Sequence, residues 1–172
     1  MKSRIGGFNI YLAALGCMLF LGCETMGGKG KKDLATLDLH REVNPDGTGK
    51  SELVPIRREE PRIYLNVEKE AFLYEADILR AEVVEMPGGF AIRLQFDHRG
   101  TKRLEAFSVY NQGKHFAINC HFPEARWLAA PLFSRRIQDG SITFTPDATR
   151  EEADRIVRGL NNVARKVHKR SF

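Results

Sequence analysis

Alternating apolar and polar positions predict the strands in the first part of the chain. In residues 90–96, "FAIRLQF", apolar side chains alternate with Arg93 and Gln95, which is the period of a strand with one buried face. Residues 78–86 precede this run across the turn signal "PGG", so the two segments predict a β-hairpin. Shorter extended runs lie at 37–43, 53–56 and 63–67, with "NPDGTG" between the first two. This pattern predicts an N-terminal β-hairpin that joins 37–43 to 53–56.

A change to helical spacing predicts two helices. Leu104 and Phe107 are followed by Tyr110 or Asn111 at helical spacing, and the glycine of "NQGK" ends the segment. The last segment, from about Thr149 to Val167, has one continuous apolar stripe, which is typical of an amphipathic helix.

The acidic stretch "FTPDATREEADRI" at residues 144–156 is the start of this second helix. Thr149 and Glu152 have the spacing of a capping box, and Glu151 and Asp154 suit the positive end of the helix dipole. Helix initiation therefore accounts for these carboxylates better than a metal site, which needs several inward-facing ligands at matched spacing.

The segments between the two helices return to strand periodicity. In residues 115–122 the side chains of Phe116, Ile118 and Cys120 face the core, and those of His115 and His121 face the other way. A loop with Trp127 is expected next, then extended runs at 132–137 and 141–145, and one helical turn is expected within 69–78. The order of elements predicts an α+β fold, with two helices packed on a mostly antiparallel sheet and an N-terminal β-hairpin extension.

The first 33 residues have the pattern of an export signal and a tether. Lys2 and Arg4 precede an apolar run at 8–21, as in a secretory signal peptide, and "LFLGC" resembles a bacterial lipobox. We therefore predict a signal peptide at 1–22 and lipidation of Cys23, with Cys17 as a second candidate and an uncleaved signal anchor as the alternative. Residues 23–33 are rich in glycine and lysine and predict a flexible tether before a single domain at 34–172. The domain is expected in the cell envelope, facing the periplasm, with membrane lipid as a partner through the acyl anchor.

Charge and cysteine content narrow the function classes. The chain of 172 residues has a formal charge of +5, and without residues 1–22 it has 25 basic against 22 acidic side chains. This excess is too small to indicate nucleic acid as a partner. If Cys23 carries lipid, Cys120 is the remaining thiol, so no intramolecular disulfide is expected.

The candidate chemical groups indicate a binding protein. His115 and His121 lie six residues apart on one strand, about 20 Å, which is too far to share a metal ion, so no metal and no cofactor are expected. Cys120, the best candidate nucleophile for a hydrolase, lies on the core face, and no catalytic motif is present, so no enzyme is expected. Trp127 is a candidate for partner contact, together with His115 and His121, although its alternative is to fold inward with Leu128.

Residues 89–172 resemble the head of the first periplasmic domain of SecD, a subunit of the bacterial preprotein translocase. The resemblance depends on turn, cap and core positions: Phe96, Gly100, Leu104, Asn111, Gly113, Lys114, Ala117, Ile118, Ala130, Pro131, Ile137, Gly140, Phe144, Thr145, Glu151, Glu152 and Ala153. SecD proteins also have several membrane spans, whereas this sequence has none beyond its leader. The resemblance therefore implies a stand-alone, lipid-anchored binding module that contacts exported polypeptide or an envelope protein and assists secretion. The alternative is an envelope structural or assembly lipoprotein unrelated to secretion.

Overall fold

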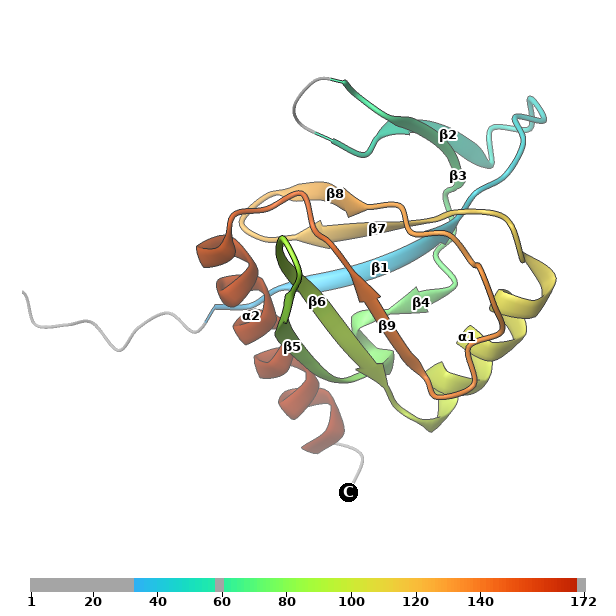
Figure 1. The fold of residues 1–172 in the computed structure, drawn as a ribbon. Helices are drawn as coiled ribbons and strands as arrows, with labels where there is room; N and C mark the ends of the chain where they lie inside the picture. The colour runs from blue at the N-terminus through green and yellow to red at the C-terminus, as the bar shows by residue number, and fades with distance from the viewer. Residues whose placement is uncertain (1–32, 58–60, 170–172) are drawn as a thin grey trace, which may run out of the picture. The chain divides into compact units, whose positions relative to one another are not determined.

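The computed structural model describes residues 33–57 and 61–169, whose arrangement is drawn in Figure 1. The predicted lipidation site at Cys23, Cys17, the signal peptide and the tether before Asp33 lie outside the described residues. The first half contains β1 (Thr36–Arg41), β2 (Ser51–Pro55), β3 (Tyr64–Glu68), β4 (Leu73–Tyr74), a 3-10 turn η1 (Glu75–Asp77), β5 (Ile78–Met86) and β6 (Gly89–Phe96). The second half contains α1 (His98–Tyr110), β7 (Phe116–His121), β8 (Ala125–Ala129), β9 (Ser141–Phe144) and α2 (Arg150–Lys169).

The described strands form two antiparallel sheets and a separate hairpin. The larger sheet has the order β4-β1-β7-β8, the smaller has the order β5-β6-β9, and β2 pairs with β3. Helix α2 packs mainly against β5, and α1 contacts β4 and β6. Figure 1 shows the two helices on opposite sides of the strands. The predicted α+β class, with two helices on antiparallel strands, is confirmed.

The main hydrophobic core lies between the two sheets and the helices. In β6 the side chains of Ile92, Leu94 and Phe96 are buried while Arg93 is exposed, as the alternation predicts. Both helices, β1, β7 and β9 add to this core, chiefly through Leu37, Leu39, Leu104, Phe116, Ile118, Ile142, Phe144, Ile156 and Leu160. Burial of each large apolar side chain stabilises the fold by about 1.5–3 kcal/mol.

Polar caps fix where both helices begin. The Thr149 hydroxyl accepts a hydrogen bond from the Glu152 N–H at 3.2 Å, which confirms the hydroxyl half of the predicted capping box. The Glu152 carboxylate forms an ion pair with Arg126 of β8, so it also ties the helix start to the larger sheet. At α1, the Asp97 carboxylate accepts from the Gly100 N–H at 2.7 Å.

The predicted pairing of the N-terminal hairpin is wrong. Strand β1 pairs with β4 and β7 inside the larger sheet, and β2 pairs with β3 in the hairpin, with Val54 opposite Leu65. The reason is that β1 buries Leu37 and Leu39 in the main core, which the short β2 strand could not cover. Periodicity identified each strand as extended but carried no information on its partner.

The predicted loop around Trp127 and the strand at 132–137 are also wrong. Trp127 lies in the middle of β8, opposite Asn119 of β7, and residues 132–137 form no strand. Leu132 makes an isolated bridge to His115. A register shift between Ile118 and Asn119 interrupts the β7–β8 ladder. This irregularity removes the regular alternation that would have identified β8 from sequence.

Candidate functional site

Trp127 holds the β2–β3 hairpin against the larger sheet. Its ring is partly buried and meets the His40 ring edge-on, with ring centroids 5.2 Å apart and an interplanar angle of 73°. It packs against a small second core that consists of Val54, Ile56, Leu65, Val67 and Ala117. Much of the indole is therefore committed to folding, and its predicted contact with a partner stays a prediction.

The two predicted histidines belong to separate clusters. His121 Nε2 lies 3.7 Å from Asp38 Oδ1, whereas His115 Nδ1 lies 3.1 Å from Glu42 Oε2. Both rings are about half exposed. Within residues 33–57 and 61–169, no group of three or more histidine, cysteine or acidic side chains is placed to hold a metal ion.

His40 of β1, which the sequence pattern did not identify, holds the β2–β3 hairpin through a hydrogen bond to β3. Its Nε2 lies 2.7 Å from Asp38 Oδ2, and its Nδ1 lies 2.8 Å from the Glu68 carbonyl oxygen of β3. Burial lowers the pKa of His40, but these two hydrogen bonds outweigh burial and leave the pKa raised. Burial likewise raises the pKa of Asp38, but hydrogen bonds from His40 and Asn119 outweigh it and leave that pKa lowered.

This pair predicts a pH dependence of folding stability. Because the His40 pKa is raised, protonated His40 stabilises the fold fully below its unfolded-state pKa of about 6.5. This stabilisation is lost as pH rises through the folded-state pKa. Because the Asp38 pKa is lowered, the ionised carboxylate stabilises the fold above about pH 4. This contribution to stability is lost as pH falls through the folded pKa. Urea unfolding should show that wild type loses stability as pH rises from 5.5 to 8, and that His40→Asn loses less over the same range. An identical loss in both proteins would contradict this role for His40.

Cys120 is poorly suited to nucleophilic chemistry. The side chain is fully buried opposite Leu37 of β1, and burial raises the pKa of its thiol to about 12. The thiol is therefore protonated at neutral pH, and the thiolate is the reactive form.

A groove lies beside β9. A hollow of about 830 Å³ and a second of about 580 Å³ meet there, because Pro131 and Thr143 line both. The two hollows together are called the β9 groove. One wall is the solvent face of β5, β6 and β9, and the other is the segment 129–139 with the β2–β3 hairpin at one end.

The free edge of β9 opens into this groove. Among the described strands, β9 pairs only with β6, so it is an edge strand of its sheet. The Phe96 N–H donates to the Gly140 carbonyl at 2.9 Å, and the register continues through Ile142 and Phe144. Because ladder bonds alternate along an antiparallel strand, the N–H and C=O of Thr143 point away from β6. Thr143 therefore offers a free donor and acceptor to an added strand.

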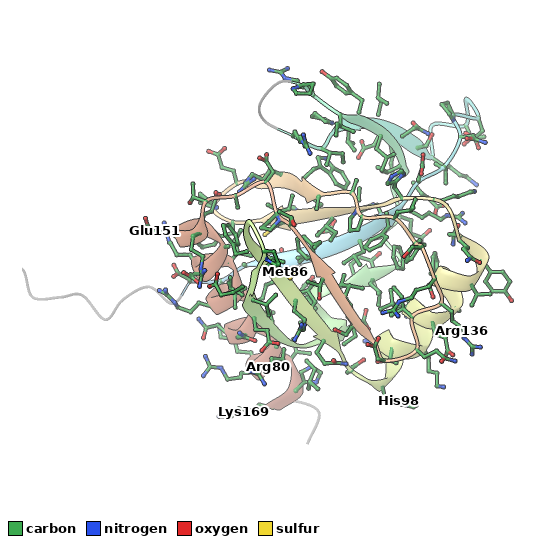
Figure 2. All side chains as sticks on the ribbon, viewed as in Figure 1. Arg80, Met86, His98, Arg136, Glu151 and Lys169 are labelled. Atoms are coloured by element: carbon green, nitrogen blue, oxygen red, sulfur yellow. The ribbon has the colours of Figure 1, made fainter. Side chains whose placement is uncertain are left out.

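The two ends of the β9 groove differ in chemistry. The smaller hollow is mainly apolar and is lined by Ile56, Ile63, Leu65, Ala130, Phe144 and Pro146. The larger hollow carries four arginines, Arg80, Arg93, Arg135 and Arg136, against the carboxylates of Glu82 and Asp139. Arg80 and Arg136 lie on either side of β9 in the view of Figure 2. Glu82 pairs with Arg80 and Arg93, and Arg136 pairs with Glu105, so a ligand that spans the groove would meet apolar side chains at one end and paired charged side chains at the other.

Of the residues predicted to contact a partner, His115 alone lines the β9 groove. Trp127 and His121 lie on the part of the larger sheet near Asp38 and the hairpin. Sequence reasoning missed Thr143 and Pro131 as groove residues. The available signal was the alternation in "SITF", which places Thr143 on a polar face next to a run without regular structure.

Comparison with known proteins supports the fold. No protein-family description and no curated protein matches the sequence. A solved structure of SecDF, described as a membrane component that enhances protein export, superposes with a TM-score of 0.56 at 21% identity, covering 76% of this chain and 63% of that one. SecDF in its super-membrane-facing form gives a TM-score of 0.56 at 20% identity, covering 76% of this chain and 19% of that one.

The chain therefore spans less than two thirds of the length of these similar structures. The predicted similarity to the SecD fold is confirmed. No helix among the described residues is long and apolar enough to cross a membrane.

Proposed function

We propose that this domain binds extended segments of exported polypeptide in the β9 groove, on the periplasmic side of the membrane that holds its anchor. The observation that carries the proposal is the open edge of β9 beside an apolar hollow. An extended chain adds to such an edge through main-chain hydrogen bonds, and pockets beside the edge select alternate side chains. Binding of this kind suits unfolded polypeptide, because it reads the backbone and a few side chains rather than a folded surface.

The similarity to SecDF supports a place in protein export. The matching SecDF structure is described as enhancing export, and this chain shares that fold over 76% of its length. We propose a binding module rather than an enzyme, held at the membrane by lipid on Cys23, with the periplasm as its compartment. Partner contact at His115 fits the β9 groove, since His115 lines it. Contact at Trp127 or His121 would require a second surface.

Titration of the purified domain with an unfolded protein tests this function. The probe is a reduced and carbamidomethylated protein that cannot refold, and the same protein in its native form is the control. The domain is expected to bind the unfolded form at least 10-fold more tightly, because the folded form has no free segment to pair with β9. Equal affinity for both forms, or no binding to either, would instead favour an assembly role in the envelope unrelated to secretion.

A further inference from the structure

The solvent face of α2 carries a continuous row of cations. Arg155, Arg158, Arg165, Lys166 and Lys169, here called the basic stripe, are all exposed. With 3.6 residues per turn, the five side chains fall within about 100° of the helix circumference. No aspartate or glutamate occurs between residues 155 and 169. Figure 2 marks Lys169 at the C-terminal end of this helix.

The fold accounts for only part of the basic stripe, since Arg155 lies over the Phe122 ring at 5.0 Å and pairs with Asp33, as does Arg158. The buried face of α2 lies on the other side of the helix, with Ile156, Leu160 and Ala164 in the core. Cations in the last turn suit the helix dipole, but Arg155 and Arg158 lie in the first half of the helix, where the dipole gives no such advantage.

Among residues 33–57 and 61–169, few carboxylates neutralise the stripe. Arg158 Nη1 lies 3.4 Å from Asp33 Oδ2, and Arg155 shares the same carboxylate at 4.0 Å. Arg165 donates to the amide oxygen of Asn162 and to the Asn161 carbonyl, which carry no net charge. The stripe therefore keeps most of its positive charge, although basic and acidic residues nearly balance over residues 32–172.

The chain enters the domain beside this stripe. Asp33 contacts Arg158, the Asn162 side chain donates to the Asp33 carbonyl at 2.9 Å, and Ala35 packs directly on Gly159. Figure 1 shows the start of β1 next to α2. The predicted lipidation site, Cys23, lies ten residues before Asp33, and a chain of this length spans at most about 35 Å.

We propose that the basic stripe docks on the anionic phospholipid surface of the membrane that holds the N-terminal anchor. Each lysine or arginine near such a surface strengthens binding about 5-fold. No residue of the stripe lines the β9 groove, so docking leaves the groove accessible. The inference does not depend on polypeptide binding. As a consequence of this docking, the lipid anchor holds the domain near the bilayer, and the basic stripe determines which face of the domain lies against the bilayer.

Vesicle co-sedimentation of a fragment spanning residues 32–172 tests the docking. This fragment corresponds to one compact unit with its own core, and it lacks the predicted anchor. We expect binding to vesicles of phosphatidylcholine with 30% phosphatidylglycerol, weakening as salt rises, and no binding to phosphatidylcholine alone. The triple variant R165Q/K166Q/K169Q is expected to lose about 100-fold in affinity for the anionic vesicles.

The matched control changes the same net charge elsewhere. K50Q/K69Q/K114Q removes three exposed cations far from α2 in sequence and is expected to bind within 3-fold of wild type. Circular dichroism confirms that both triple variants are folded. Equal losses in the two variants, no binding of wild type to anionic vesicles, or equal binding to phosphatidylcholine alone would overturn the proposal. The variant Thr143→Pro separates the two sites, since it should leave vesicle binding unchanged.

Discussion

Replacing the buried Gly159 with valine is expected to lower the free energy of unfolding by about 3 kcal/mol, the largest stability effect that we predict. A Cβ at this position would lie 2.7 Å from the Ala35 nitrogen and 2.8 Å from the Ala35 Cβ. Both atoms belong to the chain just before β1, so the new side chain would force α2 away from the sheet. Urea unfolding of residues 32–172 measures the loss.

The expected direction of the stability change for Gly159→Ala tests the same contact more sharply. In an ordinary helix interior, glycine to alanine stabilises by about 1 kcal/mol, but Gly159→Ala is expected to destabilise because even one methyl group overpacks the Ala35 contact. Lys166→Ala, at an exposed position of the same helix, is the control and should change stability by less than about 0.5 kcal/mol. A stabilised Gly159→Ala protein would show that α2 and the start of β1 are not packed as described.

Replacing Thr143 with proline is expected to weaken binding of the unfolded protein by at least about 10-fold. Proline removes the N–H that points from β9 into the groove, and its ring obstructs an added strand. The β6–β9 ladder keeps its bonds through Ile142 and Phe144, because proline is tolerated on an edge strand when its nitrogen faces outward. The measurement is the same titration with unfolded protein, accompanied by thermal unfolding to confirm that the variant is folded.

Thr143→Val is the matched control for the proline variant. It removes the hydroxyl, which accepts a weak 3.5 Å hydrogen bond from Arg93, but keeps the backbone N–H. Its affinity for unfolded protein should match wild type. If valine weakens binding as much as proline does, the side chain rather than the free strand edge is responsible.

The parts of the fold that the sequence predicts well are those encoded by local periodicity. Alternation in residues 90–96 and the turn after Met86 suffice for the β5–β6 hairpin, and the apolar stripe suffices for α2. The pairing of β1 with β7 joins residues about 80 positions apart, and no local pattern specifies it. The sequence predicts a loop at Trp127, because β8 has only five residues and a register shift beside it.

The candidate site was harder to predict than the fold, because the β9 groove has no motif. Its walls come from the hairpin, from β5 and β6, and from the segment around Pro131, which tertiary packing brings together. His40 was missed for a related reason. It lies on the outer face of β1, and the hairpin that buries it could be placed there only once the β2–β3 pairing was known.

Site-specific photo-crosslinking in cells tests the central claim most directly. A photoreactive amino acid at Leu132, which is 47% exposed and lines the larger hollow, is compared with one at Tyr110, which is 85% exposed on α1. The full-length chain is irradiated while an exported reporter is held in transit. We expect adducts with the reporter from Leu132 and none above background from Tyr110. Equal yields at the two positions, or adducts from Trp127 and His121 without any from Leu132, would contradict polypeptide binding in the β9 groove.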